Sequence, residues 1–244
     1  MHSKQHLELG NIMTLHQLAS MIDVSAVRAD SSENDVRAVA ELAKEYSCAA
    51  AFALPAFTQE LIEMLRGTPV IVGGTVGFPS GGETIAMKIA QAKELVDLGC
   101  GEIDMVQNIG KLLSGHFEQV EAEIVAVKRA IGTIPLKVIL ECSHLTLELI
   151  VTASTIAVRA GASWVKTGTG WASPGTTTEH IRLIKQTVGE TAKIKAAGGI
   201  RDFDTLIEMH RLGAERFGIG YKTAKDIFKV FLQRSNGGSI LCND

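Results

Sequence analysis

The feature that most constrains this chain is a regular alternation of short β-rich runs with amphipathic helical patterns. A weaker run at Met21–Ser25 precedes seven clearer ones, which are Cys48–Leu54, Val70–Gly77, Glu102–Val106, Leu136–Cys142, Ser163–Thr167, Lys193–Ala196 and Arg216–Gly218. Such alternation predicts parallel strands joined by right-handed crossovers. Eight strand–helix units in about 250 residues are the usual size of a closed (β/α)8 barrel.

Helical periodicity between the runs supports this prediction. Apolar residues recur at spacings of three and four, as in Phe117, Val120, Ile124, Val127 and Ile131. Glycines close several of these segments just before the next strand, as helix C-caps often do: Gly99, Gly132, Gly161, Gly189 and Gly213. The alternative, an open doubly wound sheet, is favoured by GxGxxG directly after the first strand, and the sequence has none there. We therefore expect one α/β domain over residues 1–244, a TIM barrel, with a loose tail from Ser235.

Composition and charge argue against several classes of protein. A net charge of −3 gives no sign of the basic face that nucleic-acid binding favours. The first residues lack the apolar stretch of a secretory signal, and no apolar run is long enough to span a bilayer. We expect a cytoplasmic protein with reduced cysteines and no metal, because the histidines and the four cysteines lack ligand spacing: Cys48, Cys100, Cys142 and Cys242.

Several of the predicted strands carry charges, although barrel strands should be apolar. Lys193 and Lys137 have an alternative interpretation as strand-end residues at a solvated rim. Asp104, Lys166 and Lys195 fit that interpretation poorly, because all three lie near C-terminal strand ends, where barrel active sites are built. Buried charges need partners, and these three can supply one another.

Two lysines and a carboxylate at the mouth of a barrel predict amine catalysis. An ordinary lysine has a pKa of about 10.4, so it is protonated and not nucleophilic at neutral pH. A second cation nearby destabilises the ammonium and lowers that pKa. Asp104 can accept a proton, hold a water or orient a lysine. Spacing alone does not decide whether Lys166 or Lys195 is the nucleophile.

Glycines gather in the loops that follow the last three predicted strands: Gly168, Gly170, Gly198, Gly199, Gly218 and Gly220. Glycine allows backbone N–H groups to approach an anion closely. The loops after the seventh and eighth strands form the common phosphate site of such barrels. We therefore predict a phosphate site at this rim, against the alternative that these are ordinary turn glycines.

Five segments, taken together and in order, resemble the deoxyribose-phosphate aldolase family. They are VGFPSGG (Val76–Gly82), EIDMVQNIGKLLSG (Glu102–Gly115), KVILEC (Lys137–Cys142), GASWVKTGTGW (Gly161–Trp171) and KAAGGIRDF (Lys195–Phe203). The resemblance runs from about Asp23 to the last predicted strand. It implies a (β/α)8 fold, often a homodimer, with no metal or organic cofactor.

The resemblance also implies roles and a reaction. Lys166 is the Schiff-base lysine, Lys195 lowers its pKa, and Asp104 assists proton transfer through water. The family cleaves 2-deoxyribose 5-phosphate reversibly to acetaldehyde and glyceraldehyde 3-phosphate. The expected substrate-binding residues are Asp23, Thr167, Thr169, Gly170, Gly198, Gly199, Gly220, Tyr221 and Lys222.

The departures from the family pattern concern the substrate. Where the family usually offers paired serines to phosphate, this chain reads Gly218-Ile219-Gly220-Tyr221-Lys222. Two alternatives therefore stay open. One is a class I aldolase with a different aldehyde or sugar-phosphate substrate, and the other is a non-catalytic barrel that binds a phosphorylated metabolite. The two lysines and the carboxylate argue against the second alternative, because binding alone does not require them.

Overall fold

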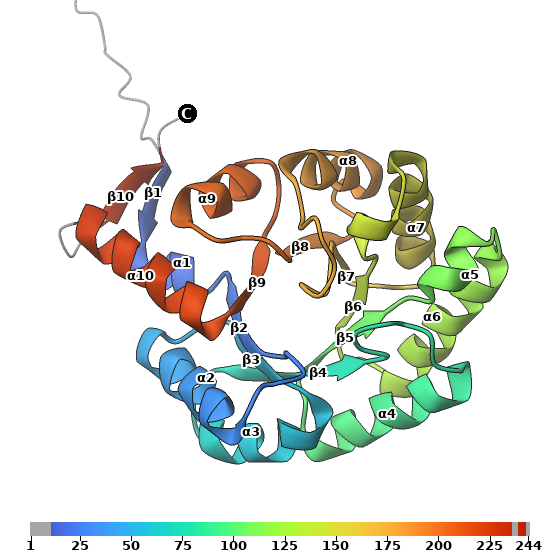
Figure 1. Cartoon of the computed structure of the whole chain (residues 1–244), viewed down its shortest axis with the longest axis horizontal. Helices are drawn as coiled ribbons and strands as arrows, with labels where there is room; N and C mark the ends of the chain where they lie inside the picture. Colours follow the sequence, from blue (N-terminus) through green and yellow to red (C-terminus); the bar gives the residue numbers. More distant parts are fainter. Residues whose placement is uncertain (1–10, 236–238, 243–244) are drawn as a thin grey trace, which may run out of the picture.

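Eight parallel strands form a closed barrel in the computed structural model, which describes residues 11–235 and 239–242 (Figure 1). The barrel strands are β2 (Ile22–Ala26), β3 (Ala50–Ala53), β4 (Ile71–Val76), β5 (Glu102–Val106), β6 (Leu136–Ile139), β7 (Trp164–Lys166), β8 (Lys193–Ala197) and β9 (Arg216–Gly220). The predicted (β/α)8 barrel is confirmed, and each of the eight predicted strands is present, one with the predicted bounds and the others with bounds that differ by a few residues.

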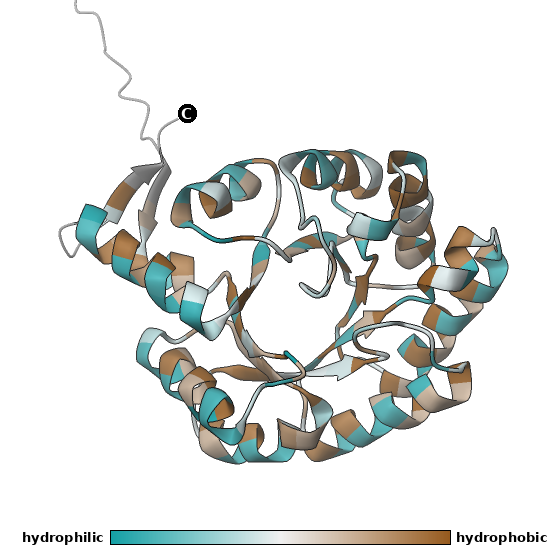
Figure 2. Ribbon diagram, in the orientation of Figure 1, coloured by the Kyte–Doolittle hydropathy of each residue, from teal (hydrophilic) through white to brown (hydrophobic). Residues whose placement is uncertain are grey.

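Helices surround the barrel on its outer side (Figure 1). They are α1 (Leu15–Ala19), α2 (Glu33–Tyr46), α3 (Thr58–Leu65), α4 (Ile85–Leu98), α5 (Ile109–Leu113), α6 (Phe117–Ile131), α7 (Leu147–Arg159), α8 (Thr178–Val188), α9 (Phe203–Arg211) and α10 (Tyr221–Ser235), with short 3-10 turns η1 (Pro55–Phe57) and η2 (Cys142–His144). Figure 2 shows hydrophilic and hydrophobic residues side by side along these helices. The apolar stripe predicted for α6 is buried except at its first residue, Phe117, which is 37% exposed.

Glycine ends the helices where the sequence predicts. Gly99 follows α4 in the left-handed region, with φ of 110°, and its N–H donates to the carbonyls of Leu95 and Val96. A residue with a Cβ adopts that conformation only with strain. The glycine therefore allows the chain to turn directly from α4 into β5.

The two ends of the described chain pair outside the barrel. Strand β1 (Asn11–Thr14) runs antiparallel to β10 (Ser239–Cys242), next to α10 (Figure 1). The expectation of a loose tail from Ser235 is therefore wrong for Ser239–Cys242, while residues 236–238, 243 and 244 lie outside the described part. The sequence does not reveal this pairing because two short segments at opposite ends of a chain carry no local signal of their contact.

A buried ion pair fixes two loops at the C-terminal end of the barrel. Lys88 of α4 is fully buried, and its Nζ lies 2.8 Å from Glu123 Oε1 of α6. The same ammonium donates to the carbonyl of Gly81 at 2.7 Å and to that of Val106 at 2.8 Å. Glu123 also accepts from the N–H of Asn108 at 3.1 Å. One pair of side chains thus holds the loops after β4 and β5, which border the site described below.

Three cysteines, Cys48, Cys100 and Cys142, are free and buried. Burial raises the pKa of each thiol to about 12, so they are poor nucleophiles. The reduced state stays a prediction, and the side chain of Cys242 lies outside the described part. Among the described helices, none has the length and apolar character needed to cross a membrane.

Candidate active site

Seven charged side chains converge inside the barrel. They are Asp23 on β2, Glu102 and Asp104 on β5, Lys137 on β6, Lys166 on β7, Lys195 on β8 and Arg216 on β9. Alternate residues of a strand point to the same face, so Glu102 and Asp104 both face inward. Lys166 and Lys195 are register partners on the adjacent strands β7 and β8, so they also face the same side of the sheet. We call this set the interior charge network.

Lys166 lies at the edge of this network. Its Nζ donates to Asp104 Oδ2 at 2.7 Å, and its side chain is 8% exposed. Burial lowers the pKa of Lys166 to about 8, against the opposing effect of Asp104 and with the help of the Lys195 charge. From the sequence, we expect the charge of Lys195 to lower the pKa of Lys166. In the structure, burial lowers that pKa more than the Lys195 charge does.

Lys195 contacts the same carboxylate oxygen as Lys166. Its Nζ lies 2.7 Å from Asp104 Oδ2 and 2.6 Å from Asp23 Oδ2, and it sits 4.1 Å from the centre of the Phe52 ring. Burial would lower the pKa of Lys195, but the charges of Asp104, Asp23 and Glu102 outweigh it and raise that pKa. Of the two lysines on Asp104, Lys195 is therefore the one that stays protonated, and Lys166 is the one that reaches the neutral form.

Lys137 corrects an expectation from the sequence. It does not lie at a solvated rim, because its side chain is fully buried and contacts Glu102, with Asp104 Oδ1 at 3.5 Å. Barrel strands place inward residues in layers, and Lys137 pairs in register with Asp104, so it belongs to the same layer. The rim interpretation does hold for Lys193, which is exposed at the start of β8.

A formal charge count agrees with this assignment. The network has four basic and three acidic side chains, so without Lys166 it has three of each, and burial raises the pKa of the Glu102 carboxyl. Arg216 completes the set, with NH1 2.6 Å from Asp23 Oδ1. Burial would raise the pKa of Asp104, but Lys166, Lys195 and Lys137 hold it far below its usual value, so this carboxylate stays ionised at neutral pH.

A small deep cavity of about 30 Å³ opens beside Lys166. Besides Lys166 and Lys195, its lining includes the aromatic rings of Phe52 and Phe78 and the hydroxyl-bearing Thr75. It continues into a wider cleft of about 440 Å³ at the C-terminal end of the barrel, since Ser25, Val27, Thr169 and Gly218 line both. A small molecule bound in the cleft can therefore extend to the Lys166 amine.

The wider cleft has the predicted glycine loops in its wall. Gly198 and Gly199 both have positive φ, 91° and 83°, and Gly220 lies directly before α10. A side chain on Gly199 would come within 2.9 Å of the backbone of Gly175, so the two loops pass too closely for any other residue. The cleft wall thus presents backbone and the N-terminus of a fifteen-residue helix, both of which suit an anion.

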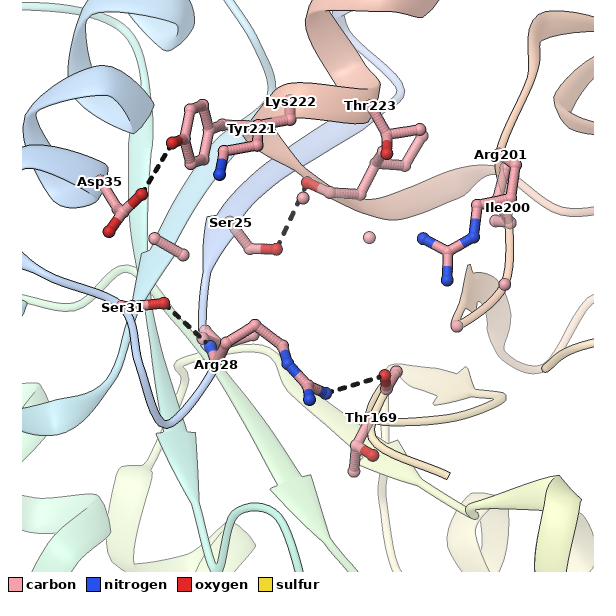
Figure 3. Close-up of a pocket in the computed structure, with 18 of the residues that line it drawn as sticks. Ser25, Arg28, Ser31, Asp35, Thr169, Ile200, Arg201, Tyr221, Lys222 and Thr223 are labelled. Carbon is pink, nitrogen blue, oxygen red and sulfur yellow. Dashed lines mark hydrogen bonds between the residues drawn. The ribbon is translucent and has the colours of Figure 1, made fainter. Parts of the chain in front are cut away.

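Two arginines in this cleft are not identified from the sequence. Figure 3 shows the guanidinium groups of Arg28 and Arg201 pointing into the cleft from different loops. Arg28 lies 4.6 Å from the centre of the Trp171 ring and donates to the Gly170 carbonyl at 3.4 Å. Arg201 belongs to the GGIR segment, which is part of the family resemblance. That segment is the sequence signal by which Arg201 could have been identified. Arg28 follows no motif.

Not every predicted substrate residue offers a free polar group. The Tyr221 hydroxyl donates to Asp35 at 2.7 Å, so it forms part of the wall (Figure 3). The Thr167 hydroxyl donates to the Ala197 carbonyl at 3.0 Å, and the Thr169 hydroxyl donates to the buried Glu141. Of the remaining predicted residues, Gly170 and Lys222 line the cleft and Asp23 lines the deep cavity.

Comparisons with known proteins agree with this chemistry. A family profile described as "DeoC/LacD family aldolase" matches residues 13–230. The chain is similar to a deoxyribose-phosphate aldolase of Sinorhizobium medicae, with 52% identity over 213 residues, 87% of this chain and 86% of that protein. A deoxyribose-phosphate aldolase of Klebsiella pneumoniae is 44% identical over 211 residues, 85% of each chain.

Solved structures resemble the fold over nearly the same extent. An aldolase structure with 33% identity covers 88% of this chain and 96% of its own, with a TM-score of 0.83. A tetrameric deoxyribose phosphate aldolase of Aeropyrum pernix, 26% identical, covers 89% and 92% with a TM-score of 0.80. Sequence and structure comparisons thus point to the same kind of protein.

Proposed function

The chain belongs to the DeoC/LacD family of aldolases, and from that premise we propose that it cleaves 2-deoxyribose 5-phosphate reversibly to acetaldehyde and glyceraldehyde 3-phosphate. The observation that carries the proposal is the geometry of three side chains. Lys166 and Lys195 both contact one oxygen of Asp104 at 2.7 Å, beside a cavity that opens to the cleft.

In the cleavage direction, the neutral amine of Lys166 attacks the C1 carbonyl carbon of the open-chain sugar and forms a carbinolamine. Loss of water gives a protonated imine on Lys166. Removal of the proton from the 3-hydroxyl makes C3 the aldehyde carbon of glyceraldehyde 3-phosphate, which leaves as the C2–C3 bond breaks. The electron pair of that bond moves toward the imine nitrogen and forms an enamine. Protonation of the enamine at C2 and hydrolysis release acetaldehyde and return the free lysine.

Each member of the trio of Lys166, Lys195 and Asp104 has a separate task in this scheme. The lowered pKa of Lys166 gives an appreciable neutral fraction near neutral pH. Lys195 stays protonated and shares the Asp104 oxygen, which weakens the support that Asp104 gives to the Lys166 ammonium. Asp104 stays ionised and relays protons through water during carbinolamine formation and breakdown.

The wider cleft is the place for the phosphate end of the substrate. The backbone of Gly198, Gly199 and Gly220 lies beside the N-terminus of α10, where an anion is stabilised by unpaired N–H groups. Arg201 and Lys222 add positive charge to this wall. These cations take the place of the serine hydroxyls that the loop after β9 lacks.

A different aldehyde acceptor is the second candidate, and one observation favours it. Where the resemblance expects paired serines, the segment Gly220–Lys222 carries only the Tyr221 hydroxyl, and that hydroxyl donates to Asp35. In either case we expect the chemistry at Lys166 to be the same. Self-association, as in the tetrameric relative of Aeropyrum pernix, remains a prediction for this chain.

The experiment that tests the proposal measures release of acetaldehyde from 2-deoxyribose 5-phosphate, with deoxyribose as the unphosphorylated comparison. We expect turnover of the phosphorylated sugar and much weaker turnover of deoxyribose. Lys166→Arg should remove both, because a guanidinium stays protonated and forms no imine. Equal turnover of the two sugars would favour the second candidate, and no turnover of any aldol would favour a binding protein.

A further inference from the structure

Thr75 is a buried hydroxyl group at the reacting end of the site that the trio does not use. It lies on β4, is 2% exposed, and pairs in register with Asp104 on β5. Since paired residues on adjacent strands point to the same side, both face the barrel interior. The Thr75 side chain lines the deep cavity together with Lys166.

The hydroxyl of Thr75 has no hydrogen-bond partner among the described residues. A buried polar group without a partner costs about 1–3 kcal/mol, so protein interiors contain few of them. The other hydroxyls that line the deep cavity are engaged. Ser25 donates to the Ile219 carbonyl at 3.3 Å, and Thr169 donates to Glu141. Within the described part of the chain, Thr75 is therefore the one hydroxyl of this cavity left available to a ligand.

The cavity is matched in size to a very small ligand. Its volume of about 30 Å³ is space for roughly two water-sized groups, on the rule that one such group needs about 10–15 Å³. Phe52 and Phe78 supply apolar wall, while Thr75 supplies a group that can both donate and accept. The lining suits a small molecule with an apolar carbon part and one oxygen atom, bound next to the Lys166 amine.

We propose that the Thr75 hydroxyl binds the oxygen of the small carbonyl donor while the donor is attached to Lys166. This inference rests on the proposed function and adds a residue to it. When the Lys166 nitrogen attacks acetaldehyde, the nitrogen gives up one proton and the carbonyl oxygen takes one up, which makes it the carbinolamine hydroxyl. That C–O bond then breaks, the nitrogen lone pair forms the C=N bond, and the hydroxyl leaves with a second proton as water. Thr75 holds this oxygen through both steps.

Position explains why this task falls to Thr75. Thr75 is the register partner of Asp104, whose Oδ2 atom accepts from Lys166 and Lys195, and Thr75 lines the same cavity as Lys166, so its hydroxyl is placed near the amine that attacks the carbonyl. A hydroxyl can donate to the oxygen of acetaldehyde and accept from the water that leaves. Because its hydroxyl contacts the reacting oxygen in this proposal, Thr75 is a catalytic residue and not a positioning residue.

Thr75→Val tests the proposal, because it removes the hydroxyl and keeps the shape. We expect the rate at which acetaldehyde forms a borohydride-trappable imine to fall about tenfold or more, in keeping with the loss of one hydrogen bond to the reacting oxygen. The KM of the acceptor aldehyde, which binds in the wider cleft, should stay within about twofold. Thr75→Ser should restore most of the rate.

Stability separates this role from a structural one. Since the Thr75 hydroxyl has no partner to lose in the part of the chain that the structure describes, Thr75→Val should leave the melting temperature unchanged or raise it. Thr58 provides a matched control, because it is 1% exposed, its hydroxyl likewise has no partner among residues 11–235 and 239–242, and it does not line the cavity. Thr58→Val should leave imine formation at the wild-type rate.

The outcomes distinguish the inference from the function on which it rests. Wild-type imine formation by Thr75→Val would overturn the role of Thr75 and leave the aldolase assignment intact. A wild-type enzyme that traps no imine would refute the proposed function itself. If the valine variant fails to fold, Thr75→Ser against Thr75→Ala makes the same comparison of a hydroxyl kept with a hydroxyl removed.

Discussion

Replacement of Lys195 by methionine should move the pH dependence of catalysis upward. The two lysine Nζ atoms each lie 2.7 Å from Asp104 Oδ2, so they are at most twice that distance apart, about 5.4 Å. Two unit charges at that separation repel by about 3 kcal/mol at an effective dielectric constant of about 20 and by about 0.8 kcal/mol in bulk water. One pKa unit corresponds to about 1.4 kcal/mol.

The expected rise in the pKa of Lys166 is therefore between about half a unit and two units, starting from about 8. The neutral amine is the reactive form, so activity rises with pH through this pKa. In Lys195→Met the rising limb of kcat/KM should shift to higher pH by that amount. At pH 7 the neutral fraction should fall roughly threefold to a hundredfold.

The assay is acetaldehyde release from 2-deoxyribose 5-phosphate between about pH 5 and 10, as a profile for each variant. Partial loss of folded enzyme scales such a profile without moving its limb, so the shift remains interpretable. Lys193→Met is the matched control, because that lysine lies two residues earlier on β8 and is exposed. An unmoved limb in folded Lys195→Met would show that burial alone sets the pKa of Lys166 and would refute the charge argument.

Two further predictions concern the cleft and the scaffold. Lys222→Ala and Arg201→Ala should each raise the KM for glyceraldehyde 3-phosphate about tenfold or more, the value of one hydrogen bond to a charged group, and leave the KM for glyceraldehyde nearly unchanged; equal effects on both acceptors would reject a phosphate role. Lys88→Met should destabilise the protein by about 3–5 kcal/mol in urea unfolding, because it leaves Glu123 buried without its cation. The double variant Lys88→Met/Glu123→Leu should be clearly more stable than Lys88→Met, and an equally unstable double variant would contradict the ion-pair explanation.

The barrel was predictable because its signals are local and repeated. Apolar periodicity, helix-ending glycines and charged residues late in strands are each visible within one segment. The same reasoning brought Asp104, Lys166 and Lys195 to one face, because the C-terminal ends of parallel strands meet at one end of a barrel. The structure then brings all three within hydrogen-bond distance.

What the sequence did not reveal depends on register and on pairs distant along the chain. Lys137 reads as a strand-start residue until its pairing with Asp104 shows that it points inward. Arg28 sits in a loop with no motif, and only the fold brings it to the cleft beside Trp171. Thr75 is an ordinary β-branched strand residue in the sequence, and its importance appears only when its hydroxyl is found without a partner beside Lys166.

The central claim is that Lys166 is the amine that forms the Schiff base, and one measurement tests it directly. The enzyme is treated with acetaldehyde and borohydride, digested, and mapped by mass spectrometry for a reduced two-carbon adduct. Both lysines line the cavity, and the adduct is predicted on Lys166 because its pKa is lowered while that of Lys195 is raised. An adduct on Lys195 in place of Lys166 would contradict the assignment of the nucleophile and of its charged neighbour together.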